Sequence, residues 1–185
     1  ETEKTNSNNS LEQIKFTDKK IIYSKILKDF PALNHEISEY TSTEINDKLL
    51  DLAIQSGAFS RFKLDIKFEA NAYKKLYTQW IINSVTKQSA DMVLVYGDSK
   101  NPKGFITLVF KPTFAQIGLI AVDANEQHQG IGKALINAAA AYASQNNFTN
   151  LQVITQAINK DACLFYERCG FNKENEIHTH HYWNK

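Results

Sequence analysis

The sequence has no apolar run that approaches the roughly 20 residues needed to cross a bilayer. It also has no block of Lys or Arg, since its 21 basic and 20 acidic residues are intermixed along the chain. A net charge of +1 without a concentrated basic face argues against binding to nucleic acid or to a membrane surface. No internal repeat or low-complexity stretch is evident, and 185 residues are enough for one domain with its own core.

Cysteine is scarce as well, and its use indicates the cellular compartment of a protein. Only Cys163 and Cys169 occur, six residues apart in a segment that predicts a helix. Their side chains then point to different faces, so we expect two semi-buried thiols rather than a disulfide. The start of the sequence shows neither the charged n-region nor the apolar h-region of a signal peptide. We therefore expect a cytoplasmic protein.

Two parts of the chain differ in composition. Residues 1–18 are rich in Asn, Ser, Thr, Glu and Lys, and we expect a flexible lead-in because they bury little apolar surface. Residues 19–185 are expected to form a single domain. Its first half predicts a short strand over His35–Tyr40, a helix opened by Thr43–Asp47 and ended near Gly57, and a helix over Asn71–Val85.

The pattern changes after residue 91 to β-branched and aromatic residues separated by turn residues, which is typical of sequential strands. The alternation of strands and helices that follows predicts an α+β (mixed α/β) fold with helices on both faces of a central sheet. The predicted elements are strands over Met92–Tyr96, Gly104–Phe110 and Phe114–Val122, a helix over Gly130–Asn146, a strand over Leu151–Thr155, a helix over Asn159–Arg168 and a strand over Ile177–Trp183.

A glycine-containing loop lies between the third predicted strand of this half and the helix that follows it. The first N–H groups of a helix lack intrahelical partners and the helix dipole adds positive charge there, so this junction suits an anion. Gly130 and Gly132 let a phosphate approach the backbone, and Lys133 adds a cation. The spacing is neither a dinucleotide fingerprint nor a Walker loop. A tight turn without a ligand would use the same glycines.

A second group of residues lies on the next predicted helix, which runs from Asn159 towards a glycine cap at Gly170. Tyr166 follows Asn159 by seven residues, or two turns, so the two side chains share a face. A phenol can donate a proton to a leaving group such as the thiolate of a thioester. Packing of Tyr166 in the core is the alternative that this helix alone leaves open.

The two motifs together, Q-x-x-G-x-G and then N-x-x-A-x-x-F-Y-x-x-x-G-F, resemble the GCN5-related N-acetyltransferase (GNAT) superfamily. The resemblance implies a central, mostly antiparallel sheet flanked by helices, and acetyl-CoA or another acyl-CoA as cosubstrate. It implies that Tyr166 is the general acid and that the strand before the loop pairs with pantetheine. The implied CoA-binding residues are Ile120, Ala121, Val122, Gln127, His128, Gln129, Gly130, Ile131, Gly132, Lys133 and Asn159.

The general base is harder to assign. Many enzymes of this family carry a carboxylate on the fourth strand, but Gly104–Phe110 contains neither Asp nor Glu. The amine then loses its proton through water, or to a carboxylate or imidazole from elsewhere in the chain. His178, His180 and His181 on the last predicted strand are candidates, and His181 is the tentative choice, with His180 on the opposite face. These histidines lack a matching Cys or carboxylate pattern, so we expect no metal.

The acceptor half resembles the dTDP-fucosamine acetyltransferase-like branch, which acylates nucleotide-linked amino sugars. Arg61 suits a phosphate, aromatic residues suit a base or sugar, and Asp65 suits hydroxyl groups. A buried helix pair with an Arg61–Asp65 salt bridge is the alternative. The candidate acceptor-binding residues are Phe59, Ser60, Arg61, Phe62, Asp65, Tyr77, Trp80, Asn83 and Ser84.

The expected function is acyl transfer from acyl-CoA, by direct attack on the thioester, to the amine of a dTDP-linked dideoxy amino sugar. Such a product would serve lipopolysaccharide O-antigen or another surface polysaccharide. Two alternatives remain: an acetyltransferase for a polyamine, peptide or antibiotic amine, and a non-catalytic acyl-CoA-binding domain. We expect no nucleic-acid or membrane partner, and a possible homodimer through the last strand, near Tyr182 and Trp183.

Overall fold

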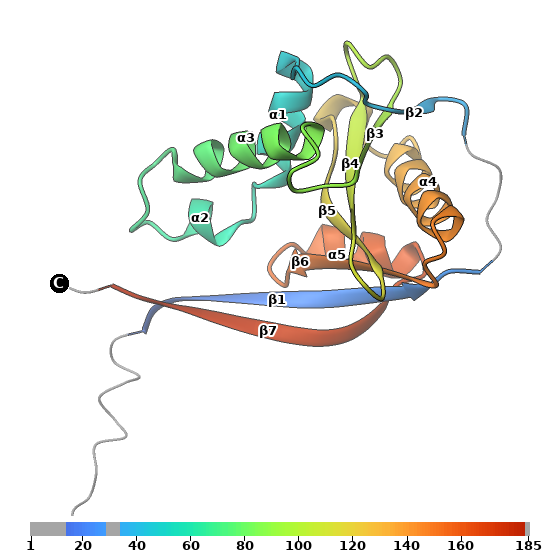
Figure 1. The fold of residues 1–185 in the computed structure, drawn as a ribbon. Coiled ribbons are helices and arrows are strands. Elements are labelled where there is room, and N and C mark those ends of the chain that lie inside the picture. The colour runs from blue at the N-terminus through green and yellow to red at the C-terminus, as the bar shows by residue number, and fades with distance from the viewer. Residues whose placement is uncertain (1–13, 29–33, 184–185) are drawn as a thin grey trace, which may run out of the picture.

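One sheet of seven strands organises the part of the chain that the computed structural model describes, residues 14–28 and 34–183 (Figure 1). The strand order is β2–β3–β4–β5–β6–β1–β7, and only β5 and β6 of these described strands run parallel. The mostly antiparallel, mixed α+β fold is therefore confirmed. The strands are β1 (Ile14–Ile26), β2 (Ile37–Glu39), β3 (Met92–Tyr96), β4 (Gly104–Phe110), β5 (Ala115–Val122), β6 (Asn150–Gln156) and β7 (Asn172–Tyr182).

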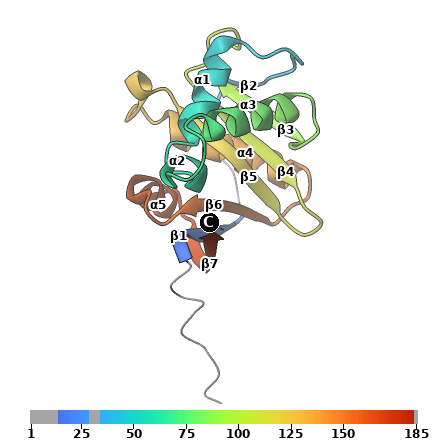
Figure 2. The same ribbon diagram turned by 90° about the vertical axis from the view of Figure 1, so that its left-hand side faces the viewer.

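Helices cover both faces of this sheet. In Figure 1, α1 and α3 lie on one side of β3, β4 and β5, and α4 lies on the other. The short helix α2 lies between α3 and the strands β1 and β6, as Figure 2 also shows. The helices are α1 (Asp47–Ser56), α2 (Arg61–Leu64), α3 (Ala72–Val85), α4 (Ile131–Gln145) and α5 (Lys160–Arg168).

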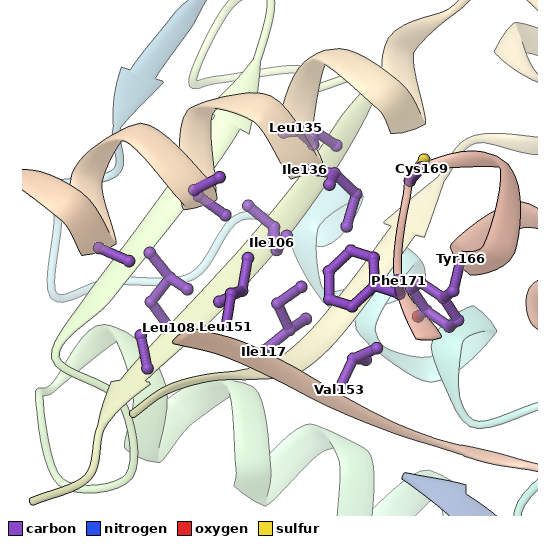
Figure 3. Packing of buried hydrophobic residues seen from close by; sticks show 14 of the residues in the cluster. Ile106, Leu108, Ile117, Leu135, Ile136, Leu151, Val153, Tyr166, Cys169 and Phe171 are labelled. Atoms are coloured by element: carbon purple, nitrogen blue, oxygen red, sulfur yellow. The ribbon is translucent and has the colours of Figure 1, made fainter. Parts of the chain in front are cut away.

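Alternating side chains of the central strands build two separate cores. Leu94 and Ile106 face α4 and α5, whereas Val93 and Phe105, their neighbours along the chain, face α1 and α3. Figure 3 shows the first core, in which Tyr166 of α5 and Phe171, the residue before β7, pack beside Val153. Burial on both faces keeps the middle of the sheet rigid, which fixes the strands that carry the site.

The position of β1 differs from expectation. This strand lies between β6 and β7 and forms backbone pairs with both. Residues 14–18, which we assigned to the flexible lead-in, belong to it, so that assignment is wrong for them; residues 1–13 lie outside the described residues. Backbone pairing on both sides does not require apolar side chains, and for this reason a polar, lysine-rich segment forms an inner strand.

The last strand also differs from expectation, because β7 begins at Asn172 rather than at Ile177. Its polar residues pair with β1 along the edge of the sheet (Figure 1). Tyr182 is 55% exposed, whereas Trp183 packs edge-on against Phe68. A homodimer through this strand stays a prediction.

Candidate active site

A cavity of about 990 Å³ connects the predicted cofactor loop to the predicted acceptor residues. Its walls come from α2, α3, β5, β6, the loop before α4, and α5. All of the predicted CoA-binding residues except Gln129 line it, and so does Tyr166. The two motifs recognised in the sequence thus meet in one space, although 26 residues of chain (133–158) lie between them.

The strands β5 and β6 part beside this cavity. They pair in parallel over Ala115–Ile117 and Leu151–Val153, and no further pairing between them exists in the described residues, although β5 continues to Val122. The facing edges of the two parted strands therefore present backbone N–H and C=O groups. An extended ligand that carries amide groups, as the pantetheine arm of CoA does, can satisfy them.

A side-chain hydroxyl marks the place where the strands part. The Thr107 hydroxyl oxygen accepts a 2.8 Å hydrogen bond from the Leu119 N–H, at an irregularity in the pairing of β4 with β5. A Cβ atom on Gly118 would lie 2.7 Å from that oxygen, so only glycine fits opposite Thr107. Neither residue was predicted from the sequence to have a role.

The loop before α4 has the features of an anion site. Gly130 is the residue that precedes the helix, and its φ of +83° is a left-handed conformation that favours glycine. A Cβ atom on Gly130 would meet no heavy atom within 4 Å, so the backbone here faces open space. Within the described residues, the N–H groups of Gln129 through Lys133 have no backbone or side-chain acceptor. These N–H groups and the helix dipole can hold a pyrophosphate.

Gly132 also allows a close contact between two helices, in addition to the expected role of its N–H group at the loop. A Cβ atom there would lie 3.1 Å from Cζ of Phe165 on α5. The glycine at this position therefore allows α4 to approach α5, in addition to leaving its N–H free. This contact brings the start of α4 next to the helix that carries Tyr166.

The helix α5 places Asn159 and Tyr166 on the same cavity. Asn159 caps the helix, because its side-chain oxygen accepts from the Ala162 N–H at 3.2 Å. Tyr166 is 4% exposed and packs against the rings of Tyr23 and Phe171. Burial raises the pKa of the Tyr166 phenol, so this phenol stays protonated at neutral pH. Its hydroxyl forms no hydrogen bond to any residue that the structure describes, and it remains available as a proton donor.

The acceptor end of the cavity includes some of the predicted residues and not others. Ser60, Arg61, Phe62, Tyr77 and Trp80 line it. A Cβ on Gly57 would lie 2.5 Å from the Tyr77 ring, so the glycine that ends α1 leaves room for this wall. Four predicted residues, Phe59, Asp65, Asn83 and Ser84, do not line the cavity.

These exceptions have physical causes. Ser84 is fully buried and donates its hydroxyl proton to the Trp80 carbonyl at 2.8 Å. The Asn83 side chain accepts from Gln79 at 2.8 Å on the same helix. Phe59 is 40% exposed outside the lining. Their positions on α3 thus turn both polar residues towards contacts within the helix rather than towards a ligand.

Asp65 and His181 form a pair outside the cavity. Nδ1 of His181 lies 2.6 Å from Oδ2 of Asp65, and the indole N–H of Trp183 donates to the same oxygen at 3.0 Å. The expected alternative, an Arg61–Asp65 salt bridge, does not form in the described residues. His181, our tentative base, does not line the cavity; its ring stacks on Phe16. Neither His178 nor His180 replaces it, because both lie on the opposite face of β7, where His180 bonds Thr17 at 3.0 Å.

One lining residue from β1 was missed by the sequence analysis. Lys20 lines the cavity, and its strand partner Gln156 does too. Burial and the nearby Arg61 lower the pKa of Lys20. Phe16, Asp18, Lys20 and Ile22 alternate with the residues between them, as one face of a strand does. The lysines in this segment made the strand pattern hard to recognise in the sequence.

The lining of the cavity is predominantly cationic. Five basic residues contribute to it, against two carboxylates, and the carboxylate of Glu126 is paired with Lys103 at 3.3 Å. Such a lining favours ligands that carry phosphate or carboxylate groups. The basic residues are Lys20, Arg61, Lys111, Lys133 and Arg168, and the acidic ones are Glu126 and Asp161.

Comparison with known proteins identifies the class to which this fold and site belong. Residues 61–171 match the Acetyltransferase (GNAT) family, and the chain therefore belongs to that family. Over 124 residues it is 30% identical to an uncharacterized N-acetyltransferase of Methanocaldococcus jannaschii, covering 63% of this chain and 55% of that protein. Over 58 residues it is 40% identical to streptothricin acetyltransferase A of Bacillus subtilis, covering 31% of this chain and 34% of that protein. The chain thus spans about half or less of the curated relatives it matches.

Solved structures show the same fold. The PaiA N-acetyltransferase of Thermoplasma acidophilum, in complex with coenzyme A, superposes with a TM-score of 0.62 at 18% identity, over 78% of this chain and 99% of that one. An acetyltransferase of Colwellia psychrerythraea superposes with a TM-score of 0.59 at 13% identity, over 94% and 59%. At these identities the likeness concerns the fold alone.

Two further findings concern the described residues only. Within residues 14–28 and 34–183, no three His, Cys, Asp or Glu side chains are grouped so that they could hold a metal ion. Among the helices in this part of the chain, none is both long and apolar enough to cross a membrane.

Proposed function

We propose that the protein transfers an acyl group from acyl-CoA to the primary amine of a small acceptor that carries an anionic group. The observation that carries this proposal is the continuous cavity, with free N–H groups at the start of α4 and with Lys20 and Arg61 at its other end. The first end suits the pyrophosphate of CoA. The second suits an acceptor with phosphate or carboxylate oxygens.

Within that class, we propose a dTDP-linked dideoxy amino sugar as the acceptor. Arg61 suits its pyrophosphate, and Trp80, Tyr77 and Phe62 line the same end, where a base or sugar ring can stack on them. The relatives named above carry no nucleotide-sugar assignment, so this acceptor rests on the lining of the cavity. The acyl group is acetyl or a larger one, because the cavity residues named here suit both.

A second acceptor class comes from the similarity to streptothricin acetyltransferase A, whose name indicates an antibiotic acceptor. A polyamine is the related alternative. Both acceptors carry several positive charges, and Lys20 and Arg61 would repel them. A non-catalytic role in acyl-CoA binding is disfavoured by Tyr166, whose protonated hydroxyl faces the cavity without a partner in the described part of the chain.

In the proposed reaction the neutral amine attacks the thioester carbonyl, the C–N bond forms and the C–S bond breaks. Tyr166 supplies the proton that the departing thiolate takes up. The loop from Gln127 to Lys133 and the parted strands β5 and β6 orient the thioester beside this phenol. We propose that the reaction takes place in the cytoplasm, where the free and buried thiols Cys163 and Cys169 stay reduced.

A thiol-release assay with acetyl-CoA tests the proposal. The acceptor panel contains dTDP-amino sugars, streptothricin and spermidine, and we expect release of CoA with a dTDP-amino sugar. Release with spermidine or streptothricin but with no dTDP-amino sugar would refute the anionic acceptor. Binding of acetyl-CoA without turnover of any amine would favour the non-catalytic alternative.

A further inference from the structure

The proposed function leaves one part of the cavity without an occupant. This part lies towards the turn between β4 and β5, away from the CoA loop and from Lys20 and Arg61, and we name it the hairpin arm. Figures 1 and 2 both show the turn between β4 and β5 far from α2, which carries Arg61. The residues that line the hairpin arm are Leu76, Ser89, Val109, Lys111, Gln116 and Ile154.

The gap between β5 and β6 sets the direction in which a bound acyl-CoA runs. The anion loop follows Val122 at the open end of the gap, and the two strands meet at Ile117 and Val153, at its closed end. A pantetheine arm that starts at the loop therefore runs along β5 towards Gly118 and brings the thioester to the closed end. Beyond this point the paired strands leave no space in the plane of the sheet, so the acyl group must turn onto one of its faces.

One of these two faces is filled by the first core. On the side of α4 and α5, Ile117 and Val153 are each 2% exposed and pack within that core. On the side of α3 the cavity continues over the sheet as the hairpin arm. A Cβ atom on Gly118 would lie 3.9 Å from Cγ2 of Val109, so position 118 faces this arm. Because glycine has no side chain, nothing at position 118 closes the way from the gap into the arm.

The hairpin arm begins apolar and ends at a cation. Val109 and Ile154 line its beginning, and Gln116, the strand partner of Val109, lies about 7 Å beyond Gly118, the length of two strand residues. Lys111 follows Val109 by two residues, where the chain turns back into β5. Among the described residues no carboxylate lines this arm, and none forms an ion pair with Lys111. A short apolar chain with a terminal carboxylate matches this order of groups.

We propose that the donor is an acyl-CoA whose acyl group ends in a carboxylate, such as succinyl-CoA or glutaryl-CoA, and that Lys111 binds this carboxylate with the help of the Gln116 amide. This inference rests on the proposed function, since it names the donor class of the same reaction. Lys111 determines specificity and does not touch the reacting atoms. The acceptor keeps the other end of the cavity, at Lys20 and Arg61.

The transfer step is the same for this longer acyl group. The amine nitrogen forms the C–N bond with the thioester carbonyl carbon, the C–S bond breaks, and the thiolate takes the proton of the Tyr166 phenol. The proton that the nitrogen loses returns to Tyr166 through water. The terminal carboxylate does not react, so the product carries one more negative charge than an acetylated one.

Isothermal titration with acyl-CoAs, without any amine, tests the donor class. Butyryl-CoA and succinyl-CoA have acyl chains of equal length and differ in the terminal carboxylate. We expect the wild type to bind succinyl-CoA about fivefold more tightly than butyryl-CoA, as one exposed ion pair allows. Lys111→Gln should abolish this preference. Lys100→Gln is the matched control and should keep it, because Lys100 is exposed in the turn between β3 and β4, outside the cavity lining.

Charge reversal gives a second readout. Lys111→Glu should bind butyryl-CoA more tightly than succinyl-CoA, because two carboxylates then repel each other. Equal affinities of the wild type for the two thioesters would overturn the inference and leave transfer from acetyl-CoA untouched. A succinyl preference that survives Lys111→Gln would place the carboxylate at another cation and overturn the role of Lys111. If the wild type bound no CoA thioester at all, the proposed function itself would fail.

Discussion

The imidazole of His181 and the carboxylate of Asp65 join two segments that lie 116 residues apart in the sequence. Asp65 follows α2, which carries Arg61 into the cavity, and His181 lies near the end of β7. Both side chains are largely buried, with 12% of His181 and 4% of Asp65 exposed. The pair therefore holds the acceptor-side segment against the β1–β7 edge of the sheet.

This pair predicts a pH-dependent contribution to stability. Burial alone would raise the pKa of Asp65, but hydrogen bonds from His181, the Lys67 N–H and Trp183 outweigh it and hold the pKa below its ordinary value. A lowered pKa in the folded state stabilises the fold above the unfolded pKa of about 3.9, and this contribution is lost as pH falls through the folded value. Asp65→Asn should lower the free energy of unfolding by about 1–3 kcal/mol at pH 7. Denaturant unfolding should show a much smaller difference near pH 2, whereas a constant difference would contradict the assignment.

His181 provides a related prediction about catalysis. Its Nδ1 bonds Asp65 and its ring does not line the cavity, so His181→Gln should reduce stability without altering the pH dependence of kcat. His180→Gln is the matched control, because His180 lies on the other face of β7. A pH–rate profile that loses one ionisation in His181→Gln only would restore His181 as the general base.

The hydroxyl of Tyr166 is the subject of the third prediction. Tyr166→Phe removes one oxygen atom that forms no hydrogen bond within the described part of the chain, so thermal stability and acetyl-CoA affinity should stay unchanged. Turnover should fall on the order of 10²-fold, since the departing thiolate loses its proton donor. Steady-state kinetics and isothermal titration with acetyl-CoA separate the two effects. Full turnover by Tyr166→Phe would remove the general-acid role.

The anion loop makes a prediction about affinity. Gly130→Ala introduces a Cβ atom at a φ of +83°, which costs about 1–2 kcal/mol and distorts the start of α4. The dissociation constant for acetyl-CoA should rise, on the order of tenfold, because the displaced loop no longer directs its N–H groups at the pyrophosphate. Gly97→Ala is the control, because Gly97 has a φ of +85° in the turn after β3. Equal affinities in the two variants would show that the loop does not hold the pyrophosphate.

Much of the fold followed from the sequence because its signals are local. The boundaries of β3 and β4 were predicted to the residue, since turn residues bound these strands on both sides. The Asn159 cap and the alanine-rich helix α4 were likewise predicted from the sequence. The strand β1 was not, because its place between β6 and β7 depends on pairing with residues more than 120 positions away.

The two halves of the candidate site also differ in how far the sequence predicts them. All residues predicted to bind CoA except Gln129 line the cavity, because a loop and a helix cap are defined by neighbouring residues. In the acceptor half the direction of each side chain depends on tertiary packing, so Asn83 and Ser84 were misassigned and Lys20 was missed. Only the structure shows that Lys20 and Arg61 approach each other from β1 and α2.

Arg61 carries the prediction that bears most directly on the acceptor. Arg61→Gln removes a cation from the cavity lining but keeps a polar side chain of similar length. A charge-assisted hydrogen bond contributes about 1.5–3 kcal/mol, so KM for a dTDP-amino sugar should rise roughly 10- to 100-fold. KM for acetyl-CoA should not change, because the CoA loop lies at the other end of the cavity.

Lys63→Gln is the control for this variant, since Lys63 lies on the same short helix but packs over the ring of Tyr73, outside the cavity lining. It removes one positive charge from α2 without touching the proposed site. An equal rise in KM for Lys63→Gln would show that general charge attraction, rather than a contact with Arg61, draws the acceptor in. A spermidine KM that falls in Arg61→Gln would further support repulsion of cationic acceptors by this arginine.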